Sequence, residues 1–232
     1  MRKYEVAHLA NNGDIAEFSR IAPATAAFEE SFAAFARGTL FQTNHGQMAI
    51  EDILPGDEIQ TVDAGFQPLI WRGGMTIIPG AVGQSPDMGT LIRVSADSLG
   101  IARPMFDLIL GPKARLFNGS HNAQVLSRTD GAYIPARDYI DGNNVIELAP
   151  PSPVQVFHLG FAHQHRVVAN GVEVETQHPG TLHELGLRGD MLTLYMSLFP
   201  HVQQFSDFGA LRYPRLRKSD LDMLNELSGV VA

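Results

Sequence analysis

Short segments in which apolar and polar residues alternate follow one another along most of the chain, separated by turn-forming residues. Lys3–Leu9 and Ile15–Ile21 flank Asn11–Asp14, a hairpin-type turn. Pro55-Gly56 suits the centre of a type II turn. Strands of roughly three to six residues with frequent turn signals are typical of an all-β domain. The further predicted strands are Leu40–Thr43, Met48–Ile50, Glu58–Val62, Pro68–Arg72, Leu91–Val94, Leu108–Leu110, Leu116–Phe117, Asn144–Leu148, Val154–Leu159, Arg166–Ala169 and Val172–Glu175.

Helical signals are few. Thr25–Ala36 contains good helix formers at an apolar spacing and is predicted to be a helix. Ser219–Leu227 begins with a serine N-cap and is followed by Gly229, which favours a helix with a glycine stop. Pro135–Tyr139 is a candidate single turn. The apolar pattern of Gly189–Phe199 fits either a helix or a buried strand.

Composition narrows the classes of function. Of 232 residues, 44% are hydrophobic and 18% are charged, which excludes a disordered chain. The net charge of −8 argues against binding to nucleic acid. Cysteine is absent, which excludes disulfides, zinc–thiolate sites and a cysteine nucleophile. No apolar run is long enough to span a membrane and the N-terminus is too polar for a secretory signal, so a cytoplasmic location is the default expectation.

Three sequence blocks carry a family resemblance. Phe35–Leu40 reads Phe-Ala-Arg-Gly-Thr-Leu and is followed by Ile50–Asp57, Ile-Glu-Asp-Ile-Leu-Pro-Gly-Asp. Arg103–Leu116 and Val156–Val172 provide the second and third blocks. Together they resemble the Hedgehog/intein (Hint) self-processing domains, in their bacterial branch. The resemblance implies a mostly β, horseshoe-like fold of short strands with pseudo-two-fold symmetry.

The resemblance covers about residues 34–180, which defines the expected domain organisation. Residues 1–33 are predicted to form an N-terminal hairpin and an approach helix. Residues 181–232 are predicted to form a mixed, partly helical C-terminal extension packed on the β domain. A homodimer through this extension is an open alternative.

The family's catalytic positions are replaced in this chain. The residue before the Phe-x-x-Gly-Thr motif attacks the preceding carbonyl in the family, and here it is Ala34, whose methyl group has no lone pair. The histidine of the second block aligns with Ala114, and Val174–Pro179 stands where a terminal His-Asn would be. Family chemistry would be intramolecular autoproteolysis. The resemblance therefore implies a degenerate domain, a binding or structural module rather than an enzyme.

The vestigial cleft implied by the resemblance contains both apolar and polar side chains. Its expected members are Ala34, Phe35, Gly38, Thr39, Asp107, Ala114, Arg115, His158 and His165. Asp107 and Arg115 are expected to form a structural pair or to lie at solvated strand ends. The alternative function is an active self-cleaving domain with Thr39 as an unusual nucleophile, or Ser31 in a different register. The favoured interpretation of Thr39 is a hydroxyl that bonds to the backbone.

A second alternative is a small metal-binding domain. His158, His163 and His165 have a spacing at which three imidazoles could reach one zinc ion. The favoured interpretation places His165 in the cleft, His158 in a strand and His163 in a turn, so no cofactor is expected. The expected partner is an unidentified protein or the chain's own flanking segment. The basic run Arg212–Lys218 is interpreted as a solvated linker, with docking to an acidic partner as the alternative.

Overall fold

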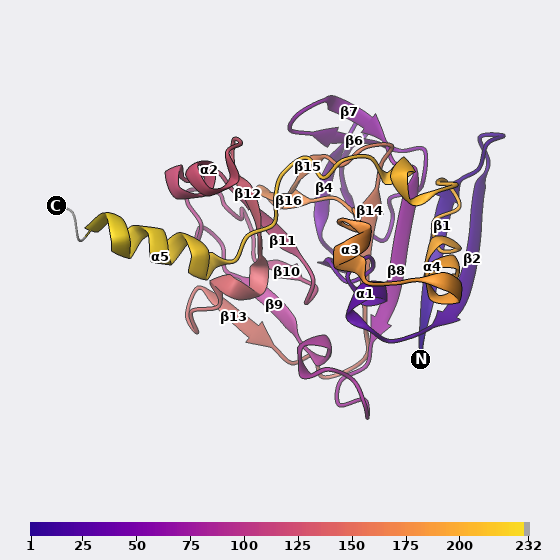
Figure 1. Cartoon of the computed structure of the whole chain (residues 1–232), viewed down its shortest axis with the longest axis horizontal. Coiled ribbons are helices and arrows are strands. Elements are labelled where there is room, and N and C mark those ends of the chain that lie inside the picture. Colours follow the sequence, from indigo (N-terminus) through magenta and orange to yellow (C-terminus); the bar gives the residue numbers. More distant parts are fainter. Residues whose placement is uncertain (230–232) are drawn as a thin grey trace.

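Strands from the N-terminal segment and from the middle of the chain meet in the first of two antiparallel sheets, sheet A (Figure 1). The computed structural model describes residues 1–229. The order of strands in sheet A is β13 (Val145–Leu148), β9 (Leu91–Val94), β10 (Leu108–Leu110), β3 (Phe35–Ala36), β14 (Val154–Gly160), β8 (Trp71–Ile77), β1 (Arg2–Leu9) and β2 (Ile15–Ala22). The β1–β2 hairpin continues the sheet because β1 pairs with β8 from Tyr4 to His8.

The second sheet, sheet B, is built from the remaining short strands. Its order is β12 (Ala132–Pro135), β11 (Arg115–Asn118), β16 (Val172–Glu175), β15 (Arg166–Ala169), β4 (Leu40–Thr43), β6 (Glu58–Thr61) and β7 (Gly65–Pro68), with β5 (Gly46–Ala49) paired to β4. Strands β4, β6 and β15 alternate between buried and more exposed residues, as a sheet with one covered face requires. The prediction of a mostly β fold is confirmed.

Helices are short and lie outside the two sheets. They are α1 (Ala26–Glu29), α2 (His121–Ser127), α3 (Leu182–Leu185), α4 (Gly189–Met196) and α5 (Lys218–Gly229), with 3-10 turns at Pro86–Gly89, Ala136–Tyr139 and Phe205–Phe208. The helix predicted at Ser219–Leu227 is present as α5, which begins one residue earlier. The ambiguous segment Gly189–Phe199 is helical through Met196. None of the described helices is long and apolar enough to cross a membrane.

The predicted helix Thr25–Ala36 is wrong beyond its first turn. Only Ala26–Glu29 is helical, and Phe35–Ala36 form β3 between β10 and β14. Phe28 and Phe32 belong to one hydrophobic core, whereas Ala34 and Phe35 belong to the other. A continuous helix would direct Phe28, Phe32 and Phe35 toward one side, so the chain must leave the helix to reach both cores.

The prediction was also wrong around Pro68–Arg72. Strand β7 ends at Pro68, and β8 starts separately at Trp71. Proline lacks an N–H and is tolerated at the edge or end of a strand, which explains the break.

Helix α2 and strand β12 were not predicted. The sequence signal for α2 was Ser120, whose side chain accepts a hydrogen bond from the Ala123 N–H at 3.3 Å.

The C-terminal extension contributes to the aromatic core on the inner side of β1 and β8. Phe199 is fully buried, with its ring 5.0 Å from Trp71 and 5.0 Å from Tyr195 between ring centroids. The Trp71 indole N–H donates to the Leu198 carbonyl at 2.8 Å. Phe32 completes the cluster against Trp71 at 5.2 Å. The extension is therefore packed on the β body through its aromatic side chains.

Phe199→Ala should lower the free energy of unfolding by about 3–5 kcal/mol, because a buried aromatic side chain leaves a cavity when it is truncated. Phe66→Ala on β7 is the matched control, since that ring is 43% exposed, and it should cost about 0.5 kcal/mol or less. Urea denaturation of the full chain measures both values. Equal effects of the two variants would mean that the extension is not part of the cooperative core.

Candidate functional site

The peptide bond between Ala33 and Ala34 is held by backbone hydrogen bonds from two distant segments. The Ala34 N–H donates to the Phe157 carbonyl at 3.1 Å. The Gly111 N–H donates to the Ala34 carbonyl at 2.8 Å, and the Lys113 N–H donates to the Ala33 carbonyl at 2.9 Å. The loop between β10 and β11 therefore lies directly against this peptide bond.

That loop also carries Ala114, so the fold brings Ala34 and Ala114 into one hydrophobic core. Ala34 and Ala114 are each 1% exposed and belong to the same hydrophobic core. A Cβ added to Gly111 would lie 2.2 Å from the Ala33 carbonyl oxygen, so the close approach requires glycine. Neither methyl group can donate, accept or attack.

A partly buried ion network, centred on the buried Glu175, lies next to this loop. The Arg115 guanidinium contacts the Glu175 carboxylate at 3.3 Å and the Glu30 carboxylate at 3.0 Å. Arg215 contacts the other oxygen of Glu175 at 2.8 Å. Burial by itself would lower the pKa of Arg115, but the carboxylates of Glu175 and Glu30 outweigh it and raise that pKa. Arg115 is therefore a charged structural residue.

Asp107 and Arg115 do not pair with each other, and Asp107 lies at an exposed strand end, the other alternative that the sequence offered. Asp107 is exposed and accepts hydrogen bonds from the Ala96 N–H at 2.9 Å and from the Arg93 side chain at 2.8 Å. These two bonds lower the pKa of its carboxyl group. Strands β9 and β10 are neighbours, so Asp107 meets Arg93, whereas Arg115 turns toward the buried Glu175 on β16.

The candidate hydroxyl nucleophiles are engaged elsewhere. Thr39 is 3% exposed, and its hydroxyl donates to the Ala36 carbonyl at 2.8 Å. The Ser31 and Tyr195 hydroxyl oxygens lie 2.7 Å apart and share a hydrogen bond. Gly38 precedes Thr39 with φ of 86°, and its N–H donates to the Glu51 carboxylate at 2.8 Å. Thr39 has the backbone-bonding role that the sequence favoured.

The three candidate metal-binding histidines do not converge. His158 lies in β14 with its ring edge-on to Phe35, 5.4 Å between centroids. His163 is exposed in a bend between strands. His165 is buried, with its Nδ1 3.2 Å from the carboxylate of Asp63. Residues 1–229 contain no group of three histidine, aspartate or glutamate side chains arranged to hold a metal ion.

The sequence analysis missed the acidic partners of these groups. Asp63 accepts from both His165 and Arg212, and Glu175 joins Arg115 to Arg215. No local motif links them, because each pair is far apart in the sequence.

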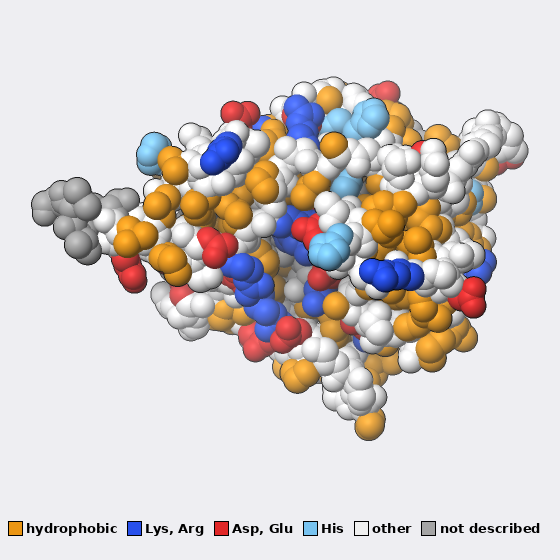
Figure 2. Space-filling view, viewed as in Figure 1, with side chains coloured by type: hydrophobic (Ala, Val, Ile, Leu, Met, Phe, Trp, Pro, Cys, Tyr) orange, Lys and Arg blue, Asp and Glu red, His pale blue; other side chains and the backbone are white. Residues whose placement is uncertain are grey.

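A recess of about 210 Å³ beside Arg215 is also lined by Glu30, His178 and Glu184. Figure 2 shows basic, acidic and histidine side chains around a central hollow on this face.

A family model for the Hint domain matches residues 33–181. This chain belongs to the Hint domain family. The match begins one residue before the Ala34 junction and ends at the start of the C-terminal extension. Within the Hint domain, the loop Gly111–Ala114 and strand β14 are the segments that surround the junction.

Solved structures of inteins and an intein-like domain are similar to part of this Hint domain. A bacterial intein-like domain from Clostridium thermocellum has 15% sequence identity, a coverage of 64% of this chain and 100% of that chain, and a TM-score of 0.40. The gp41-1 intein has 10% identity, coverages of 61% and 96%, and a TM-score of 0.37. The MchDnaB-1 intein has 16% identity, coverages of 62% and 100%, and a TM-score of 0.34. A comparison with curated proteins found no match.

His158 is kept neutral by its surroundings in the Hint domain. Burial lowers its pKa to about 3, and the nearby charges of Arg115 and Arg215 act in the same direction. The Leu159 N–H donates to His158 Nδ1 at 3.1 Å. This bond leaves the proton of the neutral ring on Nε2.

The wild-type domain should lose stability on acidification more steeply than His158→Leu. The native pKa lies below the unfolded value of 6.5, so the unfolded state binds the extra proton. The contribution of neutral His158 is complete above pH 6.5 and is lost as the pH falls toward 3, at about 1.4 kcal/mol per pH unit.

Urea denaturation from pH 7.5 to pH 4 measures how the free energy of unfolding of each protein changes with pH. The difference between the two proteins at pH 7.5 gives the effect of the altered packing alone. Parallel curves for wild type and His158→Leu across this range would contradict the assignment of a neutral His158.

Proposed function

We propose that this Hint domain no longer cleaves its own backbone at the Ala33–Ala34 junction and acts as a folded binding or structural module. The observation that carries the proposal is the pair of alanine methyl groups, Ala34 and Ala114, in a core next to an intact peptide bond. The first step of the family's chemistry is attack by a side-chain sulfur or oxygen, and residue 34 offers neither.

The backbone part of such a site is still present. The Lys113 N–H points at the Ala33 carbonyl oxygen, 2.9 Å from the donor nitrogen. A backbone donor at this oxygen would stabilise negative charge developing during attack on the carbonyl. A hydrogen bond to the Ala33 carbonyl does not cleave the peptide bond when no side chain attacks it. The arrangement therefore supports a domain that keeps the backbone donor and lacks only the reactive side chains.

The segment before the junction is built into the domain. Strand β1 lies between β2 and β8, and Phe28 and Phe32 are fully buried in the aromatic core. Cleavage after Ala33 would leave residues 1–33 held by these contacts. This arrangement supports a role in which the flanking segment serves as a permanent part of the fold.

A surface for a partner remains on the outer side of sheet A. A recess of about 650 Å³ lies across β1, β2, β8 and β14, and its lining includes Glu5, Glu17, Arg72 and Phe157. Neither Ala34 nor Ala114 contributes to it. Binding at this face would therefore not depend on the junction.

Ala34→Cys alone should stay uncleaved, whereas Ala34→Cys with Ala114→His should release residues 1–33 in the presence of dithiothreitol. Catalytic groups that act together are not additive, and a positioned acid–base group contributes typically about 10²–10⁴-fold to a rate. Denaturing intact-mass analysis is required, because the fragment would remain bound in native buffer.

Ala36→Cys with Ala114→His is the matched control, because it places the thiol two residues away in another buried position, and it should remain whole. Near-ultraviolet circular dichroism checks that the added imidazole is accommodated. Full cleavage by Ala34→Cys alone would contradict the assignment of Ala114 as the second lost group.

A further inference from the structure

Strand β2 is longer than the other strands that end the two sheets in the described part of the chain. It has eight residues and pairs with β1 over its whole length without a bulge. The end strands β13 and β7 have four residues each, and β7 ends in proline. Strand β12 is covered by the C-terminal segment, since Tyr133 N–H donates to the Pro214 carbonyl at 2.9 Å. Long unprotected edges are templates for pairing with another strand.

The outward backbone groups of β2 can be assigned from one hydrogen bond. Leu9 N–H donates to the Ile70 carbonyl at 2.8 Å, away from β2. Its partner Ile15 must therefore direct its own N–H and carbonyl outward, and alternation extends this to Glu17, Ser19 and Ile21. Among residues 1–229, no other segment donates to or accepts from this edge.

We propose that β2 pairs antiparallel with β2 of a second copy of this chain, with Phe18 opposite Phe18 on the two-fold axis. A two-fold axis perpendicular to the sheet keeps the same face of sheet A on the same side in both copies. Directly opposed residues point to the same face, so their numbers must be both odd or both even. This register places Ile15 opposite Ile21 and Glu17 opposite Ser19. All outward N–H and carbonyl groups of β2 are then paired.

In this register, the side chains of β2 in one copy are complementary to those of β2 in the other copy. Ile15 and Ile21, which are 44% and 66% exposed, cover each other in two symmetric pairs. Arg20 of one copy lies diagonal to Asp14 of the other, and both are exposed in the single chain. No like charges stand directly opposite. The Glu17 pair is diagonal, at a separation of about 7–8 Å, where solvent weakens its repulsion.

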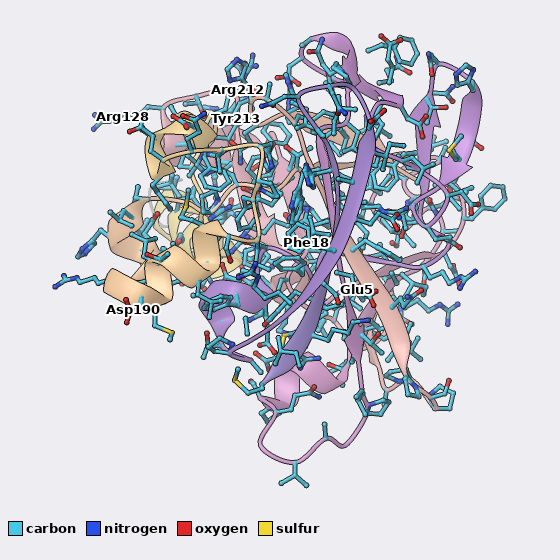
Figure 3. The ribbon with its side chains drawn as sticks, turned by 90° about the vertical axis from the view of Figure 1, so that its right-hand side faces the viewer. Glu5, Phe18, Arg128, Asp190, Arg212 and Tyr213 are labelled. Atoms are coloured by element: carbon cyan, nitrogen blue, oxygen red, sulfur yellow. The ribbon has the colours of Figure 1, made fainter. Side chains whose placement is uncertain are left out.

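The surroundings leave room for a second copy. Figure 1 shows β2 at the outer margin of the molecule, on the side away from α5. Figure 3 views this margin directly, with Glu5 and Phe18 labelled on the hairpin. Pairing here would extend sheet A continuously through both copies and place their two recesses on the same face. The inference does not depend on whether the junction is cleaved.

A single cysteine tests the register, because the chain has none of its own. Phe18→Cys should form an intermolecular disulfide, since opposed residues of a non-hydrogen-bonded pair have Cα atoms about 4.5 Å apart, within reach of a disulfide. Arg20→Cys is the control, because residue 20 lies opposite residue 16 and its symmetric copy is about 14 Å away. Non-reducing electrophoresis after mild oxidation measures both. Cross-linking of Arg20→Cys but not Phe18→Cys would overturn the register.

Sedimentation velocity of the full chain tests the dimer itself. Ser19→Pro removes one outward N–H and leaves the β1–β2 bonds intact, so the dissociation constant should rise at least about tenfold, while Ser19→Ala should match wild type. The proposal fails if wild type stays monomeric up to on the order of 100 µM. It also fails if Ser19→Pro, folded by circular dichroism, dimerises as wild type does.

Discussion

The structure depends on the hydrogen bonds that hold the Ala33–Ala34 peptide between strand β14 and the loop at Gly111. Through them, three segments far apart in the sequence meet at one place. The approach is so close that a side chain at Gly111 would collide with the Ala33 carbonyl. These hydrogen bonds hold β3 between β10 and β14, so that β3 connects strands β13, β9 and β10 of sheet A to strands β14, β8, β1 and β2. The backbone bonds at Ala33–Ala34 therefore have a structural role in sheet A, whether or not this peptide bond takes part in chemistry.

The polar groups around the joint have structural partners. Glu175 is 2% exposed and is neutralised by Arg115 and Arg215, while the neutral ring of His158 packs against Phe35. Removing one member of such a network is costly, because an uncompensated buried charge remains. Thr39 and Ser31 likewise use their hydroxyls within the fold. The surroundings of the Ala33–Ala34 peptide therefore combine apolar side chains with a fixed set of charges.

Most strands could be predicted from the sequence because short alternating segments and turn residues are local signals, as Leu40–Thr43 and Arg166–Ala169 illustrate. The helix expected through Ala36 failed because two separate cores compete for neighbouring apolar residues. The family motif predicts that Ala34 and Ala114 share one site, and both residues belong to the same hydrophobic core. The partners of Arg115 and His165 could not be found, because Glu175 and Asp63 are about 60 and 100 residues away and no short-range pattern connects them.

The central claim is that the Ala33–Ala34 bond is chemically inert in the unmodified chain. Its most direct test is the denatured mass of freshly made wild-type protein that carries an N-terminal extension, followed over days in hydroxylamine, which captures any ester formed at the junction. The account predicts one species with the mass of the whole chain at every time point. A fragment ending at Ala33, free or as its hydroxamate, would contradict it.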